Sequence, residues 1–129
     1  GREEMNNARE VLKDAWDLRE GPIVFSTVDK NGTPNSIYAL CIKLLDDGGI
    51  AVADNRFDKT RANIQSGSKG SILFITKERK SYQAKGNIEY YSAGPVFEDM
   101  RKWANPECPR LAVAVLRVES FYSGAEKLF

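Results

Sequence analysis

Several segments of this chain alternate apolar and polar residues with the two-residue period of a β-strand. The clearest is 81–92, where Tyr82, Ala84, Gly86, Ile88 and Tyr90 alternate with polar side chains. Runs of β-branched, aromatic and other apolar residues predict further strands over 23–28, 34–44, 50–54, 71–77 and 111–119. Tight turns at Asn31-Gly32 and at 46–49 join the first three strands, which predicts an antiparallel meander.

Apolar residues recur instead at three- and four-residue spacing over 3–18, which predicts an amphipathic helix that Gly21-Pro22 ends. Its apolar face comprises Met5, Ala8, Val11, Leu12, Ala15 and Trp16. Shorter helices are expected from Asp58, a suitable N-cap, to about Ser66, and from Gly94-Pro95 to about Trp103. Six antiparallel strands with three small helices favour one mainly β domain over 1–129, folded as a closed or nearly closed barrel without exposed strand edges.

Composition and charge argue against several classes of partner. The formal net charge is +1, which favours neither nucleic acid nor an anionic membrane as a partner. No apolar run approaches the roughly 18 residues of a membrane-spanning helix, and the first residues, GREEMNNAREVL, lack the apolar core of a signal peptide. The two cysteines, Cys41 and Cys108, are too few for a disulfide framework and are more consistent with free thiols. We therefore expect a cytoplasmic protein.

Histidine is absent from the chain, which excludes several kinds of catalytic and metal site. A Ser-His-Asp triad, a Cys-His dyad and a histidine-ligated zinc or heme site all require this residue. Two cysteines cannot form a Cys₄ site, so no metal site is expected. If the protein catalyses a reaction, we expect a bound organic cofactor to supply the chemistry.

The segment ADNRFDKTRANI, residues 53–64, places three cations and a threonine where a strand ends and a helix begins. The first-turn amides of a helix have no partners within the helix. Together with Lys59, Thr60 and Arg61 they would form an anion site, and phosphate is the usual anion. The alternative is a solvated turn in which Asp54 and Asp58 pair with Arg56 and Lys59.

A phosphate site alone would bind weakly. Charge-assisted hydrogen bonds contribute about 1.5–3 kcal/mol each, whereas micromolar affinity requires about 8 kcal/mol. A phosphorylated ligand would therefore need a second anchor, such as a flat ring against a barrel strand. The segment NSIYAL offers one, because Asn35 and Ser36 supply polar groups while Ile37 and Tyr38 supply packing surface.

The order of the segments PNSIYAL, IAVADNRFDKTRANI, SILFIT, YQAKGNIEYY and GPVFEDMRKW resembles the pyridoxamine 5′-phosphate oxidase-like family, over about residues 8–120. The chain is most similar to the short, single-domain members that bind flavin mononucleotide (FMN). The most specific element is the Lys-Thr-x-x-Asn motif of Lys59, Thr60 and Asn63. The resemblance implies a split β-barrel homodimer with FMN at the subunit interface, and an oxidoreductase or electron-transfer function.

The resemblance also implies which residues bind the cofactor. Lys59 and Thr60 match the segment that holds the FMN phosphate. Residues Asn35, Ser36, Ile37 and Tyr38 match the strand beside the ribityl chain and the ring, and Val52, Ala53, Asp54 and Asn55 match the strand end along the ring edge. Gln83 lies on the strand that reaches the partner's flavin, and Phe129 is a candidate cover for that flavin. A solvated face for Gln83 and a frayed tail for Phe129 are the alternatives.

Other functions remain open from the sequence. The same barrel could be a non-catalytic flavin-binding module, or it could bind the deazaflavin F420, for which Arg56 and Arg61 are the spare cations. A nucleic-acid-binding barrel could stack bases on Phe57, Tyr82, Tyr90 and Tyr91, but the near-neutral charge argues against it. The absence of histidine argues against the heme-binding branch of the fold.

Overall fold

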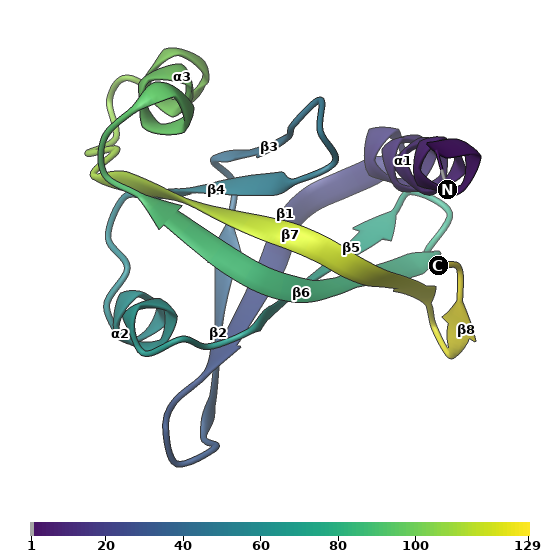
Figure 1. Ribbon diagram of the computed structural model, residues 1–129, viewed down its shortest axis with the longest axis horizontal. Helices are drawn as coiled ribbons and strands as arrows, with labels where there is room; N and C mark the ends of the chain where they lie inside the picture. Colours follow the sequence, from purple (N-terminus) through teal and green to yellow (C-terminus); the bar gives the residue numbers. More distant parts are fainter. Residues whose placement is uncertain (1) are drawn as a thin grey trace.

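A single antiparallel sheet organises the computed structural model, which describes residues 2–129 (Figure 1). Its strands are β1 (Arg19–Val28), β2 (Pro34–Ala39), β3 (Ile42–Leu44), β4 (Ile50–Asp54), β5 (Gly70–Thr76), β6 (Ser81–Tyr91), β7 (Ala112–Ser123) and β8 (Glu126–Lys127). Three helices accompany them, α1 (Arg2–Asp17), α2 (Lys59–Gln65) and α3 (Pro95–Trp103). The expected strands and helices are therefore all present, with two further short strands.

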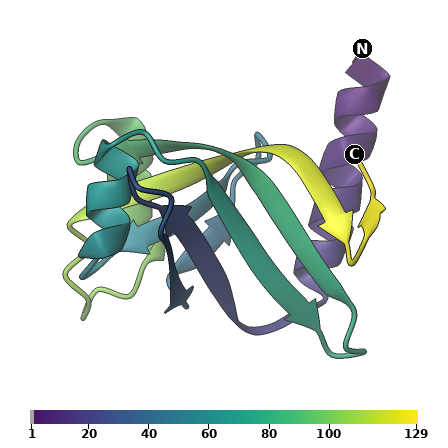
Figure 2. The ribbon, with the colours of Figure 1, turned by 90° about the horizontal axis from the view of Figure 1, so that it is seen from below.

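The sheet curls into a split barrel, which confirms the expected fold class. The strand order is β2-β1-β5-β6-β7-β4-β3, with β8 paired to β7. The first and last strands of this order, β2 and β3, follow one another in the chain, so the curl brings the two ends of the sheet together. Figure 2 shows the curl, with α1 at one end of the barrel and α2 at the other.

The segment 34–44, expected as one strand, is two strands. β2 pairs with β1, with Ile37 opposite Phe25, whereas β3 pairs with β4, with Ile42 opposite Val52. The chain changes partner at Leu40 and Cys41, which lie between the two strands. The apolar pattern continues across this corner, so nothing in the local sequence marks the change of partner.

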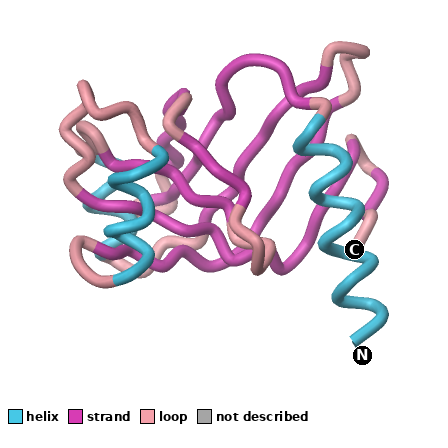
Figure 3. Tube along the Cα trace, turned by 90° about the horizontal axis from the view of Figure 1, so that it is seen from above, coloured by secondary structure: helices cyan, strands magenta, loops and turns pink. Residues whose placement is uncertain are grey.

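The core lies inside the curl and is rich in aromatic side chains. Tyr82 and Phe121 stack with their ring centroids 5.4 Å apart, and Phe74 stacks on Tyr82 at 5.5 Å. Trp16 of α1 meets Phe74 edge-on at 5.3 Å and closes one end of the barrel. The C-terminus lies beside α1, as Figure 3 shows, and Phe129 packs against the same core.

The helix α1 lies one residue from the expected position and buries the C-terminal part of the predicted face. Leu12, Ala15 and Trp16 are buried, whereas Val11 is exposed, and the side chain of Met5 lies outside the described part of the structure. The helix ends at Asp17, before Gly21-Pro22, and β1 continues through that dipeptide with an irregular register between Glu20 and Val24. Within residues 2–129, no helix is long and apolar enough to cross a membrane.

A bulge in β6 brings two backbones unusually close. The register of β6 against β7 shifts between Lys85 and Gly86. A Cβ atom at position 86 would lie 1.8 Å from the carbonyl oxygen of Arg117. Because both strands are held by their other neighbours, neither backbone can move away, and this position therefore requires glycine.

We expect Gly86→Ala to lower the free energy of unfolding by about 3 kcal/mol, because the added methyl group overlaps backbone rather than a flexible side chain. Urea denaturation followed by circular dichroism measures this change. Asn87→Ala, at the exposed neighbouring position in β6, is the matched control and should leave the stability close to that of the wild type. Equal stability of the two variants would contradict the close approach.

Candidate functional site

A groove of about 590 Å³ lies between β2 and the segment that joins β4 to α2. One wall is formed by β2 and the corner that follows it, residues 35–41. The other wall is formed by Ala53, by residues 55–60 and by Cys108. Since β2 ends the strand order, one of its edges is free to face a ligand in this groove.

The groove unites most of the residues predicted from the sequence to bind a cofactor. Those that line it are Asn35, Ser36, Ile37, Tyr38, Ala53, Asn55, Lys59 and Thr60. Val52 and Asp54 are buried behind its wall. The other two lie elsewhere: Gln83 is on β6 opposite Leu73, and the ring of Phe129 is 5.6 Å from Phe121 of its own chain.

Two residues of the Lys-Thr-x-x-Asn motif anchor α2 to the sheet, and its lysine faces the groove. The buried Asn63 donates a hydrogen bond from Nδ2 to Thr27 Oγ1 of β1 at 3.0 Å. Thr60, only 1% exposed, accepts a hydrogen bond from Asn35 Nδ2 of β2 at 3.2 Å. Lys59 is exposed and lines the groove. The motif therefore fixes the first turn of α2 against two strands and leaves its lysine available to a ligand.

Asp58 occupies the N-cap position of α2, as expected, but its side chain makes no capping hydrogen bond. An N-cap carboxylate ordinarily accepts hydrogen bonds from first-turn amides. At this helix the carboxylate does not neutralise the positive end of the helix in that way. Arg56 and Lys59 are exposed and line this end of the groove together with Asp58. The two cations exceed the one carboxylate, which leaves a net positive charge there.

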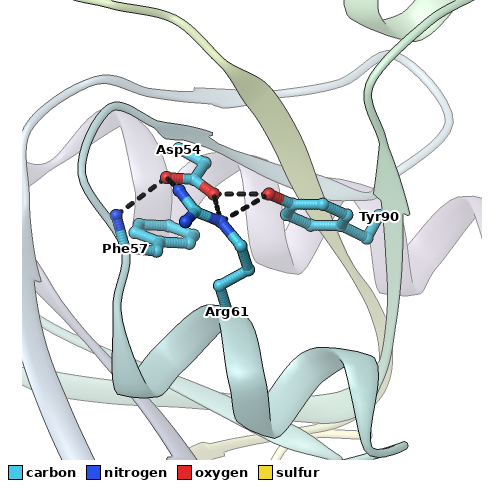
Figure 4. A network of polar contacts seen from close by, with 4 residues as sticks. All are labelled: Asp54, Phe57, Arg61 and Tyr90. Carbon is cyan, nitrogen blue, oxygen red and sulfur yellow. Dashed lines mark hydrogen bonds and ion pairs between the residues drawn. The ribbon is translucent and has the colours of Figure 1, made fainter.

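A buried carboxylate holds the groove wall in place (Figure 4). Asp54, at the end of β4, is 0% exposed and accepts two hydrogen bonds from Arg61 of α2, from Nε at 2.8 Å and from a terminal nitrogen at 2.9 Å. It also accepts a hydrogen bond from the Tyr90 hydroxyl of β6 and another from the backbone amide of Phe57 at 2.8 Å. The carboxylate thus joins β4, β6 and α2 to the turn between them.

The ionisation of this cluster follows from its contacts. The hydrogen bond to Asp54 raises the pKa of Arg61 above its usual value, so the guanidinium stays charged. Burial and the hydrogen bond to Asp54 raise the pKa of Tyr90, so the hydroxyl stays protonated. Asp54 therefore pairs with Arg61 and not with Arg56, and Arg61 is not a spare cation for a ligand.

The middle of the groove is apolar. Ile37, Ala39 and Phe57 line it and pack against the barrel core, and the Phe57 ring lies 6.1 Å from that of Phe25. Tyr38 and Leu40 also border the groove, yet they are 77% and 74% exposed. Large apolar side chains this exposed, on an edge strand and on the corner that follows it, indicate a surface that a ligand or a second chain covers.

Several groove residues were not predicted from the sequence. Leu40, Cys41, Phe57 and Cys108 line it, and Tyr90 supports its wall. Arg61, expected to face an anion, instead supports the wall through Asp54 and Tyr90. Cys41 and Cys108, which we expect as free thiols, are free and half-buried. No spacing rule links positions 41 and 108, because the chain brings them together by folding.

Comparisons with known proteins show the family and the fold of the chain. The family model described as pyridoxamine 5′-phosphate oxidase matches residues 8–123. An uncharacterized protein of Methanocaldococcus jannaschii is 32% identical over 110 residues, which is 81% of this chain and 74% of that protein. The structure of HupZ from Group A Streptococcus is 29% identical and covers 88% of this chain and 91% of its own, with a TM-score of 0.76.

More distant structures share the fold but carry different names. An FMN-binding protein from Syntrophomonas wolfei is 20% identical, with a TM-score of 0.71 and coverage of 97% of this chain and 88% of that one. An F420 reductase is 14% identical, with a TM-score of 0.62 and coverage of 81% of this chain and 91% of that one. A heme binding protein from Mycobacterium smegmatis is 16% identical, with a TM-score of 0.66 and coverage of 88% of this chain and 52% of that one. At these identities the likeness shows the fold, and the fold accommodates more than one cofactor.

We expect Asp54→Asn to lower the free energy of unfolding by about 2–3 kcal/mol, because the Arg61 charge then loses its carboxylate. The expected loss is below that of a wholly buried pair, since the Arg61 side chain is 32% exposed. Urea denaturation measures it. Asp58→Asn is the control, because this exposed carboxylate makes no capping bond; an equal loss in both variants would show that the Asp54 cluster is not what stabilises the wall.

Proposed function

Because the chain belongs to the pyridoxamine 5′-phosphate oxidase family, we propose that it binds FMN in the groove beside β2 and acts as an FMN-dependent oxidoreductase or electron-transfer protein. The observation that carries this proposal is the groove itself. It combines a positively charged end with an apolar middle in one volume of about 590 Å³, which is within the range of roughly 300–1,000 Å³ typical of cofactor sites.

The positive end suits the phosphate of FMN. Lys59 supplies a mobile ammonium group, and the first-turn amides of α2 receive no hydrogen bond from the Asp58 side chain. The Thr60 hydroxyl is held at this end by Asn35. Each charge-assisted hydrogen bond of this kind contributes about 1.5–3 kcal/mol, so two or three of them anchor one end of the ligand but do not account for tight binding alone.

The apolar middle suits the isoalloxazine ring. Ile37, Ala53 and Phe57 give it a wall that is fixed by the core. The polar groups of Asn35, Ser36 and Asn55 border this wall and suit the ribityl hydroxyls and the ring edge. The Asn55 side chain is itself held in position, because its Oδ1 accepts the backbone amide of Arg110 at 3.0 Å.

FMN, when bound, supplies the transfer of hydride or electrons, and this chain's residues bind it and set its surroundings. The chain contains no histidine, so we assign no general base among its side chains. Arg56 is the exposed cation that borders the groove beside Lys59, and its charge favours an anionic form of the cofactor. Lys85 of β6 lies 4.7 Å from the Tyr122 ring centroid and does not line the groove.

The cation count favours FMN over F420. F420 carries a longer charged tail, for which Arg56 and Arg61 would have been the additional contacts. Because Arg61 forms an ion pair with Asp54, only Arg56 of these two is available to contact such a tail. A non-catalytic flavin-binding module is the second candidate, and turnover of an electron acceptor with NADH or NADPH distinguishes it from an oxidoreductase.

We expect Lys59→Ala to weaken FMN binding by about 10- to 100-fold, because one charge-assisted contact to the phosphate is lost. Thr60→Val should have a similar effect, since it removes the hydroxyl but keeps the shape of this buried side chain. Quenching of flavin fluorescence during titration of each variant measures the affinity, and its melting temperature checks the fold. The control variant is Lys77→Ala with Ser81→Ala, two exposed residues that do not line the groove; a folded Lys59→Ala protein with wild-type affinity would place the phosphate elsewhere.

We further propose that the protein is a homodimer that pairs through the outer face of β2, β1, β5 and β6. On this face Tyr38, Val24, Leu73 and Gln83 form one row across four strands, because each is opposite the next in register. Ile75 and Leu40 extend its apolar area, and both are exposed. A second copy on this face would cover these side chains and the open side of the groove at Tyr38, and would bring Gln83 near the partner's ligand.

Leu73→Glu should convert this dimer to a monomer, because the carboxylate would be buried at the centre of the interface without a partner. Sedimentation velocity measures the state directly. Leu18→Glu is the matched control, because Leu18 is at least as exposed but lies outside the row. A wild-type protein that sediments as a monomer with flavin bound would contradict the dimer and leave the groove proposal intact.

A further inference from the structure

The two cysteines of the chain, 67 residues apart in sequence, meet at the rim of the groove. Cys41 and Cys108 both line it, both are half-buried, and both are free. A disulfide requires two sulfur atoms that can come into contact without rearrangement of the backbone. Two free thiols on the lining of the same groove are candidates for such a contact.

The backbone on both sides of the pair is held against the same strand end. The carbonyl oxygen of Cys41 accepts a hydrogen bond from the amide of Ala53 at 2.9 Å, which ties the corner after β2 to the end of β4. The loop before β7 is tied to the same strand end and the residue after it. The amide of Leu111 donates to the carbonyl oxygen of Asp54 at 2.9 Å, and the amide of Arg110 donates to Asn55 Oδ1. The segment 53–55 is therefore a common support for the two cysteine-bearing segments.

The side chain of Arg110 helps to hold the loop that carries Cys108. Arg110 Nε donates to the carbonyl oxygen of Cys108 at 3.1 Å, and a terminal nitrogen of Arg110 donates to the carbonyl oxygen of Arg101 in α3 at 2.8 Å. Pro106 and Pro109 on either side of Cys108 restrict the loop further. The position of Cys108 beside Cys41 is thus built into the fold and does not depend on a flexible tail.

We propose that Cys41 and Cys108 form a reversible disulfide, which joins the corner after β2 to the loop before β7 at the rim of the groove and slows ligand entry. Formation of the disulfide does not depend on the proposed FMN function, whereas its effect on ligand entry rests on that function.

The oxidant in this proposal is a low-molecular-weight disulfide of the glutathione class. The thiolate of one cysteine attacks a sulfur of the small disulfide, which forms a mixed disulfide and releases one small thiolate. The thiolate of the second cysteine then attacks the sulfur of the first, which closes the protein disulfide and releases the second small thiolate. The two protons lost by the cysteines pass to the two released thiolates, so the protein is oxidised by two electrons and the small disulfide is reduced.

The chemistry of the thiols suits a slow switch. Burial and the neighbouring Cys41 raise the pKa of the Cys108 thiol, so this thiol stays protonated at neutral pH. Protonated thiols react slowly with oxidants. The pair therefore stays reduced in a reducing environment and responds to a sustained excess of disulfide.

The first measurement uses oxidised glutathione with the full chain, without a cofactor. We expect the wild type to lose the mass of two hydrogen atoms and to yield, after trypsin, one linked species of peptides 31–43 and 103–110. Cys41→Ser and Cys108→Ser should each retain a stable glutathione adduct on the remaining cysteine. A wild-type protein that keeps two free thiols, or carries stable glutathione adducts, would overturn the proposal.

The second measurement compares the rate of FMN association with the reduced and the oxidised wild type by quenching of flavin fluorescence. We expect a decrease of about tenfold on oxidation, and no decrease when the double variant Cys41→Ser with Cys108→Ser, which can form neither the disulfide nor an adduct, receives the same treatment. An unchanged rate in a protein shown to be linked would overturn the effect on ligand entry. If the reduced protein binds no FMN, the proposed function fails, and the peptide analysis still decides whether the disulfide forms.

Discussion

The contacts of one buried carboxylate set the shape of the candidate site. Asp54 ends β4, and its two oxygens bind Arg61 of α2, Tyr90 of β6 and the amide of Phe57. A carboxylate with no exposed surface is stable only when its charge is compensated and its lone pairs are occupied. The cluster meets both conditions, and in doing so it fixes the turn 55–58 and the start of α2 relative to the barrel.

The rest of the groove depends on that anchoring. Because Arg61 is held by Asp54, α2 is held against two strands, where Asn35 of β2 bonds Thr60 and Asn63 bonds Thr27 of β1. The exposed Lys59 and Arg56 then stand at the groove mouth without a role in holding the helix. Within this short segment, Arg61 and Asn63 therefore hold the helix, whereas Arg56 and Lys59 are exposed on the groove.

The barrel contributes the second constraint, which is a sheet with two ends. The strands β2 and β3 lie at opposite ends of the strand order but are joined by Leu40 and Cys41. This corner leaves an edge of β2 free and places exposed apolar side chains beside it. The same corner holds Cys41 over Ala53, opposite the loop of Cys108, so the groove, the proposed pairing face and the cysteine pair all derive from one change of strand partner.

The sequence alone determined the kind of fold and much of the site. Alternation over 81–92 and the Asn31-Gly32 turn predicted an antiparallel sheet, because side-chain period and turn chemistry are local properties. The order of motifs identified the family and the residues Asn35 to Tyr38, Lys59 and Thr60, which the structure brings to one groove. Only the tertiary structure decided that Asp54 pairs with Arg61 and not with Arg56, which is nearer in the sequence. It also decided that 34–44 divides between two partner strands, and that Cys41 and Cys108 line the same groove. These are contacts between segments whose spacing in the sequence carries no information, because the curl of the sheet and the burial of each side chain select the partner.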